Sequence, residues 1–351
     1  NKLSEKDKFG LLIQTAADGG LDLEARKVVL NMWIDLYPDD PEPYKKLAIW
    51  SELNGDIEET ENYYNKILEL NPGAQEYILK MGDLYYDLTN DFDNAEKYYL
   101  QYKDLYPKNP ETYFKIGKLY GAKENHTKAL DYFEKSKILG KKGSEVDIWI
   151  AAALSVIENW SPDKYAEFLM GKVAQYENET WFNEGASAVY ASIQVNYALF
   201  GQYKKAMPYI EKNLQTILKN QGEAFYHFSR AHYLDCYAKL GMKKEADILM
   251  AEIEAKLINT PPFNLFYPVN FMKYYSKIEN FEALNSLIDK HMPLLEQSGV
   301  NMFIAFGKTA QGDYYRHIGD YEKAIKLYTE SLDLVTASYD WANHVPLGII
   351  Y

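Results

Sequence analysis

The sequence contains little cysteine and no excess of basic residues, and both absences exclude classes of function. Its 351 residues include a single cysteine, Cys236, so an intrachain disulfide framework and a multi-cysteine metal site are excluded. Lys and Arg total 38 against 51 Asp and Glu, which gives a formal net charge of -13. Because phosphate backbones and anionic lipids repel such a chain, neither a nucleic acid nor a membrane partner is expected.

Long hydrophobic runs and strand patterns are missing as well. The longest apolar stretch, Ile148–Ile157, is about half of the roughly 20 residues that a membrane helix needs. Apolar residues recur at helical spacing, and no stretch shows the period of two that is typical of a strand. Hydrophobic residues make up 47% of the chain and charged residues 25%, so the chain can form a core and global disorder is excluded. An all-α protein is therefore predicted.

A pattern of about 34 residues repeats through the first part of the chain. Pro38, Pro72 and Pro107 each end an aromatic-rich run, because proline has no N–H to donate and ends a helix. Between the prolines, small residues allow two helices to approach, and a large residue one turn after the second small one fills the remaining space. These residues are Ala48 and Tyr64 in one copy, Gly82, Ala95 and Tyr99 in the next, and Gly117, Ala129 and Phe133 in the third. Each unit is predicted to be a helical hairpin that is stable only when stacked on its neighbours.

The pattern continues toward the C-terminus with a longer period of about 39–40 residues. The clearest late copy contains Gly312, Tyr315, Ala324 and Tyr328, whereas residues 141–182 fit neither period. We therefore predict an N-terminal array over residues 1–140 with about four hairpins, an irregular helical junction over 141–182 and a C-terminal array over 183–351.

Both ends of the sequence carry further expectations. A first helix is expected over Ser4–Ala17, and half of a further unit over Tyr339–Tyr351. Because the chain begins at Asn1 without an initiator methionine, we expect a fragment or a mature form. The compartment stays open: the cytoplasm is favoured, and the periplasm applies if an upstream signal was removed.

At the repeated residues the chain resembles the tetratricopeptide repeat family. The resemblance implies a right-handed superhelical solenoid of stacked helix-turn-helix units, whose first helices line a concave face that binds a protein or peptide. The segment Glu24–Pro72 is also similar to repeat regions attached to bacterial protein kinases and transcription regulators, which implies a sensory module of a larger protein. Family members that grip acidic chaperone tails carry Lys and Asn one turn apart. Here Ile49 follows Lys45, so that role is not expected.

Helical spacing places a second stripe beside the packed residues of each first helix, and we predict that this stripe lines the groove. It contains apolar, aromatic and charged side chains together, as peptide sites often do. The predicted binding residues are Lys45, Ile49, Leu79, Asp83, Tyr86, Phe114 and Lys118 in the first array, and Asp235, Asp313 and Arg316 in the second.

No catalytic chemistry is predicted. Phosphate-binding glycine loops, a nucleophile elbow and metal-binding histidine spacings are absent from the sequence, so no cofactor, metal or catalytic residue is expected. Cys236 is interpreted as a packed core thiol. Two alternatives to a binding scaffold stay open. One is self-association into a homo-oligomer through the hairpin around Phe263–Tyr275. The other is a small-molecule receptor or enzyme with a pocket that gathers Asp235, Asp313, Arg230 and His317.

Overall fold

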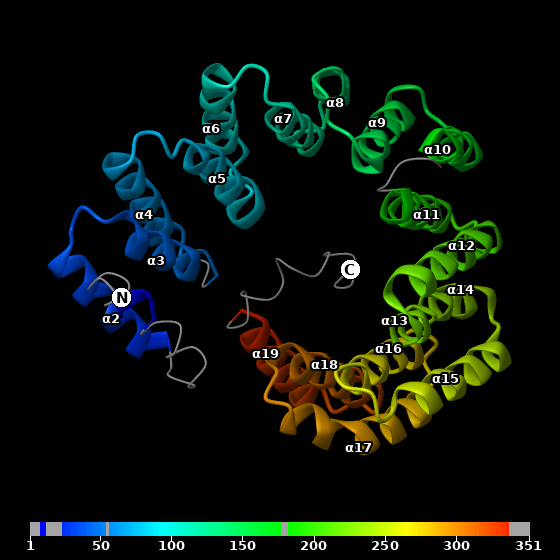
Figure 1. Ribbon diagram of the computed structural model, residues 1–351. Coiled ribbons are helices and arrows are strands. Elements are labelled where there is room, and N and C mark those ends of the chain that lie inside the picture. The colour runs from blue at the N-terminus through cyan, green and yellow to red at the C-terminus, as the bar shows by residue number, and fades with distance from the viewer. Residues whose placement is uncertain (1–7, 12–22, 54–55, 177–181, 337–351) are drawn as a thin grey trace. The chain divides into compact units, whose positions relative to one another are not determined.

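The computed structural model describes residues 8–11, 23–53, 56–176 and 182–336, and every regular element in these ranges is a helix (Figure 1). The chain divides into two compact units, one that runs as far as Leu139 and one from Gly140 to Ser338. We call them unit 1 and unit 2. Most of the first helix expected over Ser4–Ala17, and all of the half unit expected over Tyr339–Tyr351, lie outside the described residues.

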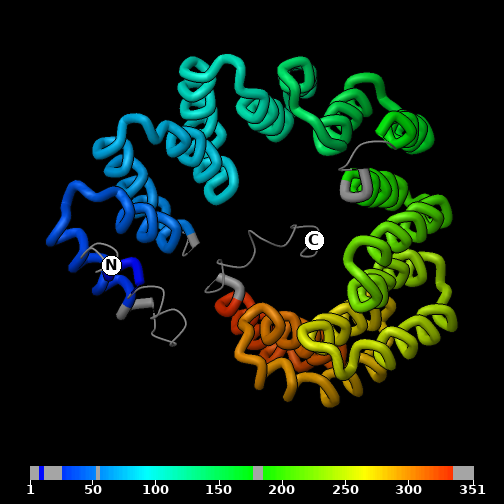
Figure 2. The backbone as a smooth tube through the Cα atoms, viewed as in Figure 1, coloured from blue at the N-terminus to red at the C-terminus, as the bar shows by residue number. Residues whose placement is uncertain are grey.

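Unit 1 consists of helical hairpins in which each first helix packs against the second helix that follows it. The hairpins are α3 with α4, α5 with α6, and α7 with α8, and α2 packs on α3. In Figure 2, α3, α5 and α7 lie along one side of the unit and α4, α6 and α8 along the other. The bounds are α2 Leu23–Leu36, α3 Pro41–Leu53, α4 Ile57–Leu70, α5 Glu76–Leu84, η1 Tyr85–Thr89, α6 Phe92–Leu105, α7 Pro110–Ala122 and α8 His126–Ile138.

Local sequence explains where these helices begin. Asp56, Asp91, Asn109 and Asn125 precede α4, α6, α7 and α8, and each side chain accepts a hydrogen bond from a backbone N–H of the first turn. Such caps satisfy N–H groups that have no partner inside a helix. Pro110 occupies the first position of α7, where its missing N–H costs nothing.

The expected close approach of paired helices is present. A Cβ atom built on Gly117 would lie 2.5 Å from the ring of Phe133, and one built on Gly82 would overlap the ring of Tyr99. Phe133 and Tyr99 are both buried. The small residue on one helix is therefore required by the large residue on the other.

Unit 2 is also built of packed helices, and several of them are longer than those of unit 1. Helix α12 has 19 residues, whereas α8 in unit 1 has 13, so the lengthened period comes at least in part from longer helices. The bounds are α9 Ser144–Ile157, α10 Pro162–Tyr176, α11 Phe182–Leu199, α12 Tyr203–Gln221, α13 Glu223–Ser229, α14 His232–Leu240, α15 Lys243–Leu257, α16 Phe263–Lys277, α17 Phe281–Gln297, α18 Asn301–His317 and α19 Tyr321–Thr336.

The segment 141–176, part of the range that fits neither sequence period, contains α9 and α10. These helices pack on α11 within unit 2. Ala151, Leu169 and Val189, from three successive helices, share one buried cluster. In the parts of the chain that the structure describes, the predicted all-α fold of stacked hairpins is confirmed.

Candidate binding face

Within three hairpins, a tyrosine on the second helix donates its hydroxyl proton to a carboxylate on the first helix. Tyr64 donates to Glu52 at 2.7 Å, and Tyr99 donates to Asp83 at 2.8 Å. In unit 2, Tyr328 donates to Asp313 at 2.7 Å. Two carboxylates that the sequence assigned to binding, Asp83 and Asp313, therefore also hold the large residue that packs their own hairpin.

In unit 1 these carboxylates belong to a larger polar surface on the first helices. Lys115 on α7 forms an ion pair with Asp83 on α5 at 2.8 Å. The ammonium nitrogen of Lys118 lies 5.5 Å from the ring centroid of Tyr86. We call this surface the unit-1 face and define it as Glu52, Asp83, Tyr86, Asp87, Lys115 and Lys118.

A π-helical turn, η1, places Tyr86 and Asp87 on this face. The turn directly continues α5 and ends at Asn90, whose φ of 53° is left-handed. Tyr85 is six residues before the N-cap Asp91, whereas its counterpart Tyr120 is five residues before Asn125, so the turn accommodates one extra residue. Such single π-turns are frequent at functional sites.

Two neighbouring groups on the unit-1 face make no hydrogen bond with the residues that the structure describes. They are the hydroxyl of Tyr86 and the carboxylate of Asp87. Desolvation, followed by the charge of Asp83, raises the pKa of Asp87, although Lys118 and Lys115 act in the opposite direction. Desolvation also raises the pKa of Tyr86. Tyr86 is half-buried and Asp87 is exposed, so both groups are able to form a hydrogen bond with a ligand.

The other residues predicted to line the first groove differ in exposure. Lys45 is half-buried and pairs with Glu42 on its own helix at 2.8 Å, and that bond raises its pKa. Ile49 is 49% exposed, and Leu79 is half-buried. Lys45 and Ile49 lie on α3, the helix that carries Glu52 of the unit-1 face. Leu79 lies on α5, the helix that carries Asp83.

The prediction for Phe114 is wrong. Its side chain is only 2% exposed and packs against Phe133, with 5.7 Å between the ring centroids. Helix α7 turns this residue into its own hairpin, on the side of Gly117, instead of toward a partner. Phe114 is a core residue and does not belong to the candidate site.

In unit 2, the predicted residues occur in two separate groups of contacts. Asp235 on α14 pairs with Lys277 on α16 at 2.6 Å. Asp313 accepts hydrogen bonds from Tyr328 and Ser276, and Arg316 lies 3.9 Å from it. Both carboxylate oxygens of Asp313 thus accept a hydrogen bond inside the unit.

The proposed convergence of polar residues on one pocket is not observed. Arg230 pairs with Glu252 on α15 at 2.6 Å, and His317 stacks on Phe281 with 4.0 Å between ring centroids. In the described part of unit 2, no hydrogen bond or ion pair joins either residue to Asp235 or Asp313. Over the described ranges there is also no group of three or more His, Cys, Asp and Glu side chains arranged to hold a metal ion.

The segment Phe263–Tyr275 provides little free surface for self-association. Phe263, Tyr267, Phe271 and Tyr274 are all buried in one cluster with α14 and α15. Cys236 is 3% exposed, and desolvation followed by the charge of Asp235 raises its pKa to about 11. Its thiol is therefore protonated near neutral pH.

Family models match three segments at the hairpins described above. Three models, each described as tetratricopeptide repeat, match residues 76–109, 110–137 and 309–338. The first two segments cover α5 to α8, and the third covers α19 and the last part of α18. The chain therefore contains tetratricopeptide repeats. The small and large residues of the repeats, Gly82 with Tyr99 and Gly117 with Phe133, lie in the matched segments.

Solved structures share the fold. The apo form of the quorum sensor NprR from B. thuringiensis is 14% identical, with a TM-score of 0.50, and the match covers 95% of this chain and 100% of that one. A tetratricopeptide repeat protein from Parabacteroides merdae is 17% identical, with a TM-score of 0.50, covering 76% of this chain and 98% of that one. At these identities the likeness shows the fold alone. No protein in the curated set matches the chain.

Sequence reasoning missed two members of the unit-1 face, Asp87 and Lys115, whereas Glu52 lies on the stripe predicted from Lys45 and Ile49. Asp87 could not be predicted from the sequence, because the π-turn η1 sets its position. None of the described helices is long and apolar enough to cross a lipid bilayer.

Proposed function

We propose that this protein is a non-catalytic binding module for a segment of a protein or peptide, and that the unit-1 face is its contact surface. The observation that carries the proposal is the pair of adjacent groups on η1, the Tyr86 hydroxyl and the Asp87 carboxylate. Neither has a hydrogen-bond partner within the described ranges, and the half-buried Tyr86 and the exposed Asp87 are both within reach of a ligand. A ligand that supplies the missing bonds gains affinity.

A polypeptide segment suits this surface better than a small apolar molecule. Its backbone can donate N–H groups to Asp87 and accept a bond from Tyr86, while its side chains meet charges of both signs. Asp83 and Asp87 favour a basic side chain, and Lys118 favours an acidic one nearby. The fold that the chain shares with a quorum sensor supports a sensory role within a larger bacterial protein, by analogy of fold.

The proposal is tested with a random peptide library displayed on phage and panned against the whole chain. Selected peptides are then titrated against the wild type, Tyr86→Phe and Asp87→Asn by fluorescence anisotropy. Each variant removes one hydrogen-bonding group with little change in size, and each is expected to weaken binding about fivefold to tenfold. Asp104→Asn is the matched control, because Asp104 is 76% exposed on α6, in the other layer of the hairpins.

Binding of every selected peptide to Tyr86→Phe and Asp87→Asn with wild-type affinity would show that the unit-1 face is not the site. Equal weakening by Asp104→Asn would attribute the effect to general charge instead. Failure of the library to yield any saturable binder would overturn the proposal as well.

A further inference from the structure

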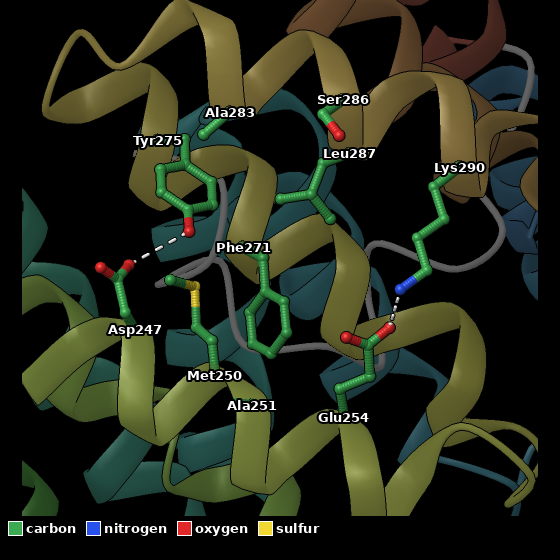
Figure 3. A pocket seen from close by; sticks show the side chains of 10 residues that line it. All are labelled: Asp247, Met250, Ala251, Glu254, Phe271, Tyr275, Ala283, Ser286, Leu287 and Lys290. Atoms are coloured by element: carbon green, nitrogen blue, oxygen red, sulfur yellow. Dashed lines mark hydrogen bonds and ion pairs between the residues drawn. The ribbon is translucent and has the colours of Figure 1, made fainter. Parts of the chain in front are cut away.

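A groove between the second helices α15 and α17 of unit 2 is separate from the unit-1 face (Figure 3). Its volume is about 320 Å³, and α16 contributes Phe271 and Tyr275 to its lining. Met250 and Leu287 add apolar surface from α15 and α17. Two polar contacts, Tyr275 with Asp247 and Lys290 with Glu254, stand on opposite sides of this apolar surface in Figure 3.

In unit 1, two stacked tyrosines occupy the corresponding position between successive second helices. Tyr85 donates its hydroxyl proton to one oxygen of Glu61 at 2.6 Å, and Tyr98 donates to the other oxygen at 2.8 Å. The two rings are stacked, with 5.7 Å between centroids and an interplanar angle of 10°. One carboxylate thus receives a tyrosine from the next first helix and another from the next second helix.

The following interface of unit 1 repeats the stacked pair. Tyr120 donates to Glu96, and its ring stacks on Tyr132 with 5.5 Å between centroids. Tyr98 and Tyr132 occupy the same position of the repeat, because each is seven residues after the N-cap residue of its helix, Asp91 or Asn125. The position of the second tyrosine is therefore determined by its distance in sequence from the N-cap of its helix.

The interface of α15 with α16 and α17 has the first tyrosine and lacks the second. Tyr275 donates to Oδ1 of Asp247 at 3.2 Å, as Tyr85 donates to Glu61. Helix α17 is capped by Asn280, and the residue seven positions later is Leu287. A leucine has neither the ring nor the hydroxyl, and the groove lies between Leu287, Phe271 and Tyr275 (Figure 3). Oδ2 of Asp247 makes no hydrogen bond within the described part of the chain.

We propose that this groove binds a tyrosine side chain presented by a segment of a partner protein. The ring stacks against Tyr275 beside Leu287, and the hydroxyl donates to Oδ2 of Asp247. Both contacts already occur inside unit 1, where Tyr98 makes them with Tyr85 and Glu61. Stacked aromatic rings attract each other, and a hydrogen bond to an ionised carboxylate is stronger than one between neutral groups.

A partner polypeptide is the occupant that the shape favours. The groove is open to solvent, so a side chain can enter while its backbone stays outside. Its volume is near the lower end of the range of about 300–1,000 Å³ for ligand pockets, which suits one aromatic side chain. Lys290 and Glu254, across the apolar surface from Asp247, provide charges for the flanking residues of the segment.

The test uses two blocked amino acids that differ by one hydroxyl group, N-acetyl-tyrosinamide and N-acetyl-phenylalaninamide. Each is titrated into the whole chain while the methyl resonances of Met250 and Leu287 are followed by NMR. The tyrosine amide is expected to give saturable shifts, and the phenylalanine amide to bind at least about tenfold more weakly. Asp247→Ala is expected to remove that difference. Absence of saturable shifts, or equal affinity for both amides on the wild type, would overturn the proposal.

Leu287→Tyr supplies the missing side chain from within the protein. The variant is expected to fold with a raised unfolding temperature, as the register of Tyr98 allows, and to lose binding of the tyrosine amide, followed here at Met250. Leu294→Tyr is the control, because Leu294 is 37% exposed on the same helix and does not line the groove. A folded Leu287→Tyr protein that keeps wild-type affinity contradicts the proposal. If that variant does not fold, the titration of Asp247→Ala with the two amides still tests the proposal. None of these outcomes bears on the unit-1 face.

Discussion

The ring of Tyr99 lies over the Cα atom of Gly82, and its hydroxyl donates a hydrogen bond of 2.8 Å to the adjacent Asp83. One side chain thus fills the space between two helices and uses a carboxylate of the unit-1 face. Asp83 in turn accepts from Lys115 of the next hairpin. The packing of one repeat and the charge distribution of the candidate site are therefore coupled through this residue.

Replacement of Gly82 by alanine is expected to destabilise the protein by about 1–3 kcal/mol. The new Cβ would overlap the buried Tyr99 ring, and the core can accept the extra atom only by moving that ring or the helix. The measurement is the free energy of unfolding in urea. Gly171→Ala is the control: a Cβ there meets nothing within 4 Å, so a gain of about 0.5–1 kcal/mol is expected from helix propensity. Equal stability of Gly82→Ala and the wild type would contradict the packing described here.

The sequence was sufficient to predict the hairpins and their small and large residues. Gly82 and Tyr99 both lie in an amphipathic pattern whose period is fixed by helix geometry, so their contact follows from covalent order. The hydroxyl partner of Tyr99 could not be predicted in the same way. It depends on how two helices are rotated against each other, and Asp83 and Asp87 are equally acidic in the sequence.

Candidate site residues were harder to predict than core residues. Phe114 was predicted to line the groove because the predicted stripe was one residue out of register on α7. A shift of one residue along a helix corresponds to a rotation of about 100° around its axis. The π-turn η1 then adds a residue to one first helix and changes which side chains follow α5 on the unit-1 face. Neither the rotation of a helix nor a π-turn changes the apolar periodicity of the sequence. Asp87 was therefore missed, although the adjacent Tyr86 was predicted.

Phe114→Ala is expected to lower the free energy of unfolding by about 3–5 kcal/mol, because it removes a ring that is 2% exposed from the core of α7 and α8. Ile49→Ala, at a position that is 49% exposed, is expected to change it by no more than about 0.5 kcal/mol. Urea unfolding followed by circular dichroism measures both. Similar small effects of the two substitutions would mean that Phe114 is not a core residue.

Cys236 is expected to react slowly with a thiol reagent in the native protein at pH 8. Its side chain is 3% exposed, and a pKa of about 11 leaves little of the reactive thiolate. Reaction with Ellman's reagent should therefore proceed only through local opening and accelerate strongly in urea. The urea-unfolded chain is the control for the intrinsic rate. Native and unfolded protein reacting at the same rate would contradict the burial of this thiol.

Stability is expected to fall as the pH rises from about 10 to about 12. Desolvation first, and then hydrogen bonds to carboxylates, raise the pKa of Tyr98 and Tyr328 from the ordinary 10.0 to about 12. A raised pKa in the folded state means that the unfolded chain loses its proton first, so the contribution is complete below pH 10 and is lost as the pH passes through 12. Urea unfolding at successive pH values, with tyrosinate absorbance recorded in parallel, measures this. Tyr98→Phe removes one titrating group and should make the decline shallower, whereas the control Tyr106→Phe, at a ring that is 40% exposed, should leave it unchanged. A decline in Tyr98→Phe as steep as in the wild type would show that the bond to Glu61 does not contribute to it.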